Sequence, residues 1–138
     1  MDQIYQDRIL AFARAARDAA PVASPTHTAT VSNPTCGDRV EIRLVLKNDR
    51  IDAVSATVRG CALCEAGAGL LTKGAIGQTP AEVRTLRDSL SGWLGGDETG
   101  KINDDMAAFA PVRAIRNRHK CVTLAFEASV TALSEGRD

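Results

Sequence analysis

The chain has 138 residues, of which 44% are hydrophobic and 25% are charged. This balance excludes intrinsic disorder and predicts one packed domain over residues 1–138. The 17 basic and 17 acidic side chains cancel, and aromatic residues make up only 4% of the chain. Proteins that bind nucleic acid or a membrane surface normally carry a basic excess, so neither kind of partner is expected.

The sequence also lacks the usual marks of export and of membrane insertion. Its apolar runs are a few residues long, whereas a membrane helix needs about 20 apolar residues. Charged residues occur within the first eight positions, where a secretion signal would turn apolar. We therefore expect a cytoplasmic protein. In a reducing compartment cysteines are more typical of ligands or reactive thiols than of disulfides, although any one can be inert and buried; the four are Cys36, Cys61, Cys64 and Cys121.

The first predicted element is a helix over residues 3–20, because apolar side chains recur there at helical spacing. Pro21 ends this helix. Residues 21–35 are rich in proline, serine and threonine and are predicted to be a linker-like segment. A short edge strand near residues 28–31 is only weakly indicated.

An antiparallel hairpin gives the clearest strand pattern. Apolar and polar residues alternate over residues 40–47 and again over residues 53–59, on either side of a turn at residues 48–50. In such a hairpin the numbers of paired residues add to a constant, which is about 98 here. Residue 38 should therefore face about residue 60, and residue 36 about residue 62.

This register brings chemistry-bearing side chains to the open end of the hairpin. Cys36 and Asp38 precede the first strand, and Cys61 directly follows the second. An error of one or two residues in the turn does not separate them. Two thiols and one carboxylate are therefore predicted to meet there.

The rest of the chain is predicted to be mainly helical. Two glycines in the first of these helices weaken its helix propensity, which indicates close packing against a neighbour. The second begins with a capping box formed by Thr79 and Glu82. The predicted segments are a helix over residues 62–76, a helix over residues 80–94, one or two short helices within residues 104–118 broken at Pro111, a last helix from about Cys121, and a frayed tail over residues 135–138.

Cys61 and Cys121 are both expected at the start of a helix. Unpaired N–H groups and the helix dipole favour a thiolate at such a position. Arg118, His119 and Lys120 add positive charge beside Cys121. If the fold carries Cys121 to the hairpin end, three thiolates and one carboxylate form a four-ligand set. Such a set suits zinc or a small iron–sulfur unit.

The spacing of the cysteines excludes some familiar sites. Only Cys61 and Cys64 form a close pair, whereas a zinc ribbon or finger needs two such pairs. A redox function of the pair would normally require a thioredoxin-like βαβ unit, which an antiparallel hairpin does not supply. Redox catalysis is therefore disfavoured.

Three segments resemble the ligand motifs of the U-type iron–sulfur assembly proteins, namely IscU, SufU and the N-terminal domain of NifU. Residues 33–39 (NPTCGDR) resemble the first motif, residues 59–61 (RGC) the second and residues 118–124 (RHKCVTL) the third, which opens a C-terminal helix. The resemblance runs from about residue 3 to residue 134. It is specific because three cysteines occur in order, with an aspartate two residues after the first.

The resemblance implies an α+β fold of the SufE/IscU-like kind, with a small antiparallel sheet of about three strands packed on one face by helices. It implies Cys36, Asp38, Cys61 and Cys121 as the ligands of zinc, iron or a transient [2Fe–2S] cluster. It also implies sulfur transfer from a cysteine desulfurase of the SufS or IscS type, as a persulfide, and delivery to apo iron–sulfur client or carrier proteins. Such a protein is a scaffold or a sulfurtransferase-type acceptor rather than a classical enzyme.

Within that family the chain resembles the SufU branch most closely. Cys61 and Cys121 lie 60 positions apart, which is longer than is typical of IscU, and Lys120 replaces the histidine that IscU usually carries there. A SufU-like protein would bind zinc and activate the desulfurase without being the scaffold, with Cys36 as the sulfur acceptor. An IscU-like protein would accept sulfur on Cys121.

Several alternatives stay open from the sequence. Cys64 is not a standard ligand of the family, and it could be a substitute ligand, a resolving thiol or a packing residue. His119 could replace Asp38 as a ligand in some states. A rival function is a structural zinc-binding interaction module, which would unfold when its metal is removed.

Overall fold

The computed structural model describes residues 3–35 and 37–135. Cys36 and the end of the predicted tail, residues 136–138, lie outside the described residues. No helix within the described part is long and apolar enough to span a membrane. The elements, in chain order, are α1 (Gln3–Asp18), β1 (His27–Asn33), β2 (Asp38–Lys47), β3 (Arg50–Arg59), α2 (Ala62–Ala75), α3 (Pro80–Leu94), α4 (Asp104–Ala107), η1 (Ala110–Ala114), η2 (Arg116–Arg118) and α5 (His119–Glu135).

The three strands form one antiparallel sheet in the order β1-β2-β3. The β2–β3 hairpin has the predicted register, since Arg39 pairs with Arg59 and this relation continues to Val45. A register shift between Val45 and Leu46 then leads into the turn. Asn48 and Asp49 form the turn with positive φ angles of 53° and 62°, the left-handed conformation that a two-residue hairpin turn requires.

β1 is longer than the sequence indicated, and the linker-like prediction for residues 21–35 is therefore wrong over seven residues, His27–Asn33. The strand is an edge strand paired only with β2. Its inward side chains include small Ala29, and its outward ones are serine and threonine, so the apolar alternation is weak. Hydrogen bonds hold part of the preceding segment on the outer face of the sheet, from Val22 N to Ser55 Oγ (2.8 Å) and from Arg43 Nε to the Val22 carbonyl (2.7 Å).

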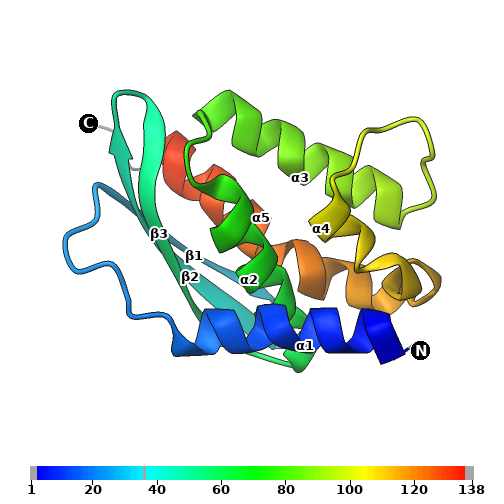
Figure 1. Cartoon of the computed structure of the whole chain (residues 1–138). Helices are drawn as coiled ribbons and strands as arrows, with labels where there is room; N and C mark the ends of the chain where they lie inside the picture. Colours follow the sequence, from blue (N-terminus) through cyan, green and yellow to red (C-terminus); the bar gives the residue numbers. More distant parts are fainter. Residues whose placement is uncertain (1–2, 36, 136–138) are drawn as a thin grey trace.

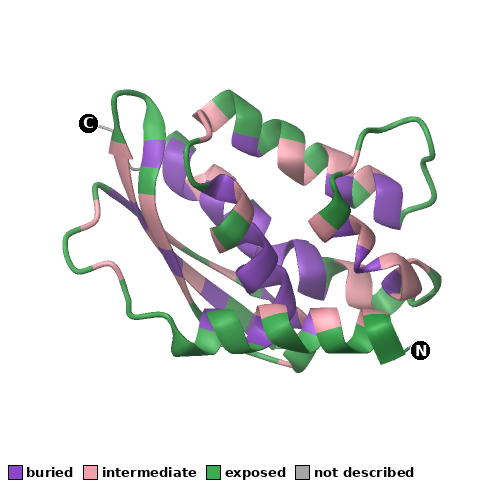
Figure 2. Ribbon diagram, viewed as in Figure 1, coloured by how far each residue is buried: buried purple, intermediate pink, exposed green. Residues whose placement is uncertain are grey.

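The helices cover one face of the sheet (Figure 1). α5 packs on β1 and β2, α2 packs on β3, and both helices contact each other. Alternate side chains of β2, including Val40, Ile42 and Leu44, are fully buried beneath them. Figure 2 shows that buried residues concentrate between the sheet and the helices. The α+β fold with a three-stranded sheet, as the resemblance implied, is confirmed.

Glycines allow α2 to lie very close to its neighbours. A Cβ atom on Gly67 would overlap the backbone of Val122 in α5, and one on Gly69 would overlap the backbone of Phe12 in α1. The predicted close packing is thus confirmed. Because α2 and α5 touch backbone to backbone near their N-terminal halves, the two helix starts are brought to the same end of the sheet.

Candidate metal centre

The hairpin places Asp38 and Cys61 side by side. Asp38 is the first residue of β2, and the paired register ends at Arg39 with Arg59, so Cys61 follows β3 by two residues. Cys61 is the N-cap of α2, with an extended backbone (φ −74°, ψ 171°). Both residues therefore lie at the open end of the hairpin, as the predicted register required.

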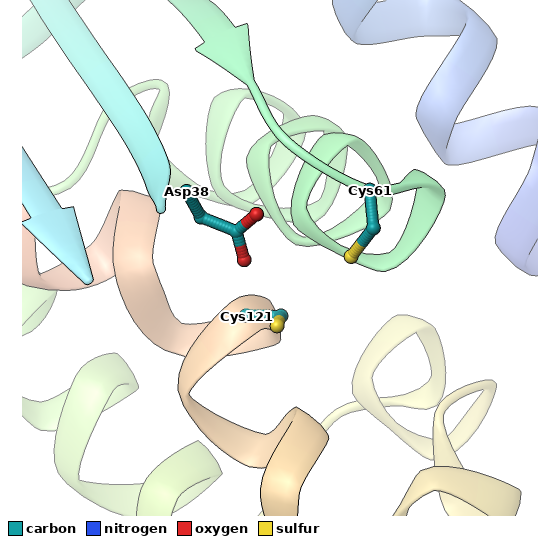
Figure 3. A group of neighbouring side chains, drawn as sticks. All are labelled: Asp38, Cys61 and Cys121. Atoms are coloured by element: carbon teal, nitrogen blue, oxygen red, sulfur yellow. The ribbon is translucent and has the colours of Figure 1, made fainter. Parts of the chain in front are cut away.

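α5 brings the third side chain to this end. The helix begins at His119, two residues earlier than predicted, so Cys121 lies in its first turn. The ligand atoms of Asp38, Cys61 and Cys121 all lie within 4.8 Å of one another. Figure 3 shows the three side chains converging from β2, the start of α2 and the start of α5. Within the described residues, these three are the group whose donor atoms could hold a metal ion.

Cys36 lies outside the described residues, and the described residues on either side of it, Asn33 and Asp38, pair with each other beside the centre. Asn33 at the end of β1 pairs with Asp38 at the start of β2. The Gly37 N–H donates to the Asn33 carbonyl (2.8 Å), and the Asn33 side chain accepts from the Thr35 N–H (3.2 Å). The described residues that flank position 36 are therefore held close to Asp38.

The centre is half enclosed. Asp38 and Cys121 are 4% and 1% exposed, whereas Cys61 is partly exposed. Arg118 lies at the rim, and its guanidinium shares a hydrogen bond with the Cys121 thiol. This hydrogen bond and the nearby Cys61, Cys121 and Asp38 charges raise the pKa of Arg118. From the sequence, Arg118 was expected only to add positive charge near Cys121. Its contact with the thiol follows from the 3₁₀ turn η2, which ends at Arg118 directly before α5.

The pKa of the Cys121 thiol is raised, not lowered as its position at a helix start had led us to expect. Burial raises the pKa of the Cys121 thiol, and a hydrogen bond with Asp38 and the charge of Cys61 raise it further. The Arg118 hydrogen bond acts in the opposite direction but does not outweigh them. The helix start and the nearby cations, which are visible in the sequence, favour a low pKa. Burial of the thiol depends on tertiary packing, and it has the larger effect.

Gly60 was not singled out from the sequence, yet it shapes the centre. A Cβ atom there would lie 2.5 Å from Oδ1 of Asp38 and 3.2 Å from Cβ of Cys64. Glycine therefore gives the Asp38 carboxylate the space it occupies. In the sequence, Gly60 stood out only as the residue directly before Cys61 in the motif at residues 59–61.

The two side chains with open roles occupy different places. His119 Nε2 is hydrogen-bonded to the carbonyls of Val112 (2.9 Å) and Arg113 (3.1 Å). This nitrogen therefore contacts the backbone of η1. Cys64 is 1% exposed and lies in the first turn of α2, where its Cβ would be 3.2 Å from a Cβ atom built on Gly60. Neither belongs to the group with converging donor atoms.

Two thiols and one carboxylate form a mixed donor set. Thiolates are soft ligands that suit zinc and iron–sulfur units, and carboxylate oxygen is a harder ligand that also binds zinc. The partial exposure of Cys61 leaves the centre open on one side. The chemistry of the donors thus fits a metal that can be reached and exchanged.

The fold and the centre define a family. Residues 4–128 match the model of the NifU-like N terminal domain, so the chain belongs to this family. The resemblance that the sequence motifs indicated is confirmed.

Individual relatives agree with this assignment. The chain is 29% identical over 105 residues to the iron-sulfur cluster assembly scaffold protein IscU of Streptococcus pyogenes serotype M1, covering 75% of this chain and 66% of that protein. It is 28% identical over 100 residues to the zinc-dependent sulfurtransferase SufU of Bacillus subtilis (strain 168), covering 71% of this chain and 68% of that protein. The chain thus spans about two thirds of the length of each.

A solved structure shows the same fold. The N-terminal part of a nitrogen-fixing NifU-like protein from Brucella abortus superposes with a TM-score of 0.82 and 31% identity, over 95% of this chain and 92% of that one. The chain is thus a member of the iron–sulfur assembly scaffold family, with relatives named for both the IscU and the SufU branches.

Proposed function

We propose that this chain accepts sulfur from a cysteine desulfurase and assembles a transient [2Fe–2S] cluster, which it passes to apo iron–sulfur proteins. One observation carries the proposal. Asp38, Cys61 and Cys121 come from three separate elements, yet their donor atoms lie within 4.8 Å of one another. A relative named as a cluster assembly scaffold supports the same function.

The proposed ligand set is Cys36, Asp38, Cys61 and Cys121. Cys36 stands in the sequence between Asn33 and Asp38, which pair with each other, and this supports its inclusion. Three thiolates and one carboxylate give the four ligands that a [2Fe–2S] cargo requires.

Asp38 has a distinct proposed role. A carboxylate oxygen is a poorer match than thiolate for the soft iron of a cluster. The bond to Asp38 is therefore the one that exchanges first when the cargo is handed on. The partly exposed side of the centre, next to Cys61, supports exchange from that direction.

Sulfur acceptance requires a thiolate that attacks the outer sulfur of a desulfurase persulfide, leaving the desulfurase cysteine as a thiolate. The burial of Cys121 and its raised pKa in the metal-free chain disfavour it as the first acceptor. We therefore propose that Cys36 accepts the sulfur first, as expected for a SufU-like protein. If the chain works as IscU-like proteins do, Cys121 is the sulfur acceptor instead.

A second candidate function is a zinc-bound sulfur acceptor that activates the desulfurase without building the cluster. Donors on one zinc lie about 2.0–2.3 Å from it, so they are less than about 4.6 Å apart. Donor atoms within 4.8 Å of one another need only small shifts to share one ion. The 28% identity to a zinc-dependent sulfurtransferase supports this candidate too.

Metal analysis separates the two candidates. The chain is purified without added metal under oxygen-free conditions, and zinc and iron are quantified. About one equivalent of tightly held zinc, together with faster turnover of a cysteine desulfurase, supports the acceptor. A reconstituted visible chromophore containing two irons per chain, transferred to an apo-ferredoxin, supports the scaffold. A chain that holds neither metal and neither stimulates nor transfers contradicts both.

A further inference from the structure

Cys61 and Cys64 occupy two special positions of one helix terminus. Cys61 is the N-cap of α2 and Cys64 is its third helical residue. The extended backbone of an N-cap allows its side chain to turn back over the first turn, toward the third residue. The chain shows this geometry in α3, where the N-cap Thr79 Oγ1 accepts a hydrogen bond from the Glu82 N–H (3.2 Å). The Cys61 side chain makes no such cap hydrogen bond, and its sulfur points toward Asp38 and Cys121 (Figure 3), so it meets Cys64 only after a side-chain rotation.

The spacing of this pair suits a disulfide. Helix geometry separates Cα atoms three residues apart by about 5 Å, and disulfides typically join Cα atoms about 4.4–6.8 Å apart. The antiparallel hairpin does not prevent this arrangement, because the pair needs only a strand that leads into a helix start. β3 followed by α2 supplies it.

The two thiols differ in access. Cys61 is partly exposed, and its sulfur is one of the three converging donors. Cys64 is 1% exposed and is packed against Gly60, on the side where Asp38 also lies. An external sulfur donor can therefore reach Cys61, either directly or after first acceptance by Cys36, whereas the buried Cys64 is closed to external donors.

We propose that Cys64 is a resolving thiol that converts a persulfide on Cys61 into sulfide, an activity that rests on the proposed function because it uses sulfur delivered to this centre. The Cys64 sulfur attacks the inner sulfur of the Cys61 persulfide. A Cys61–Cys64 disulfide forms, the bond between the two persulfide sulfurs breaks, and hydrosulfide leaves with the proton of the Cys64 thiol. The two cysteines are oxidised and the transferred sulfur is reduced by two electrons.

This step supplies what cluster building consumes. A [2Fe–2S] cargo contains sulfide, whereas a persulfide carries sulfur two electrons more oxidised. The disulfide also removes Cys61 from the ligand set until an external dithiol, such as a thioredoxin-type reductant, restores both thiols. Cys61 therefore cannot take part in sulfur reduction and bind metal at the same time.

The test uses the full chain, stripped of metal by a chelator and held without oxygen, with one equivalent of glutathione persulfide as donor. We expect sulfide release together with loss of two hydrogen atoms in the intact mass, and a linked Cys61–Cys64 peptide after digestion. In Cys64→Ala we expect the mass of one extra sulfur to persist on Cys61 and sulfide release to slow at least tenfold. Cys64→Ser serves as the second variant, and circular dichroism confirms folding of each.

Two controls make the result decisive. The double variant Cys36→Ser/Cys121→Ser keeps only the proposed pair and should still release sulfide. Equal sulfide release by the native chain and Cys64→Ala, a native chain that takes up no sulfur, or absence of the linked peptide would each overturn the proposal. Zinc added before the donor should protect Cys61. Failure to protect would count against the proposed metal centre rather than against the resolving thiol, because no desulfurase and no metal are needed for the main reaction.

Discussion

Gly60 and Asp38 are packed so closely that any side chain on Gly60 would displace the Asp38 carboxylate. A Cβ atom would lie 2.5 Å from Oδ1 and 3.0 Å from Cγ of Asp38. The two residues come from neighbouring strand ends, since Asp38 is the first residue of β2 and Gly60 directly follows β3. The position of the proposed exchangeable ligand therefore depends on the absence of a side chain on the facing strand.

Replacing Gly60 by alanine should weaken metal binding while leaving the fold in place. Displacing a ligand by changing a group behind it typically costs about tenfold to a hundredfold in metal affinity. We expect a loss in this range for zinc, measured by competition with a chromophoric chelator. Gly74→Ala is the matched control, because nothing lies within 4 Å of a Cβ atom there. Unchanged zinc affinity in Gly60→Ala would show that Asp38 is not held by this contact.

Replacing two glycines of α2 by alanine should change the stability of the chain in opposite directions. In Gly67→Ala the new methyl group meets the Val122 backbone, which cannot rotate away, so we expect a loss of about 1–3 kcal/mol in the free energy of unfolding. Gly74→Ala adds a methyl group in open space and should gain about 0.5–1 kcal/mol. Urea unfolding of the two variants checks this. Equal stability of both would argue against the close approach of α2 and α5.

Asp38→Ala should stabilise a bound cluster. The carboxylate is the poorest match for iron in the proposed set, and exchange of its bond is the proposed first step of cargo release, so its removal should slow that release. We expect a severalfold longer half-life of the reconstituted chromophore, followed by absorbance. Asp52→Ala is the control, because Asp52 is exposed on β3. Faster decay in Asp38→Ala would refute the role given to this carboxylate.

The metal-free chain should lose stability in alkaline solution because of Cys121. Burial raises the pKa of this thiol in the folded state, so the folded state keeps its proton when the unfolded chain has lost it. The contribution is complete below the unfolded pKa of about 8.5 and decreases by up to about 1.4 kcal/mol per pH unit above it. Urea unfolding of the reduced, chelator-treated chain at pH 7, 9 and 10 measures this. Cys121→Ala should show a smaller dependence on pH, and an identical dependence would contradict the assignment.

Removing the metal should leave the fold largely intact, in contrast to a structural zinc module. The core between the sheet and α2, α3 and α5 is fully buried without any contribution from a metal. We expect chelator-treated protein to keep its helical circular dichroism and a cooperative thermal transition at a lower Tm, since a bound ion stabilises by mass action. Complete unfolding by the chelator would favour the structural module.

The parts that could be predicted from the sequence are those that local pattern determines. The alternation along β2 and β3 gives the register of the hairpin, and this places Asp38 beside Cys61 without reference to the rest of the fold. Thr79 and Glu82 likewise mark the start of α3 through a local capping box.

The remaining features depend on contacts between distant segments. Cys121 reaches the centre because Gly67 lets α5 pack against α2. The glycines of α2 indicated close packing, but no local pattern showed that α5 is the neighbour. The same packing buries Cys121 and raises its pKa. The length of β1 was underestimated because its inward positions include the small side chains of Ala29 and Val31, which give a weak apolar alternation. The strand forms through its pairing with β2.

The most direct test of the centre is a zinc titration of the reduced chain and of its single cysteine variants under oxygen-free conditions. We predict about one tightly bound equivalent in the native chain and in Cys64→Ala, and loss of tight binding in Cys36→Ser, Cys61→Ser and Cys121→Ser. Tight binding that survives in both Cys61→Ser and Cys121→Ser would contradict a metal centre built where the donor atoms of Asp38, Cys61 and Cys121 converge.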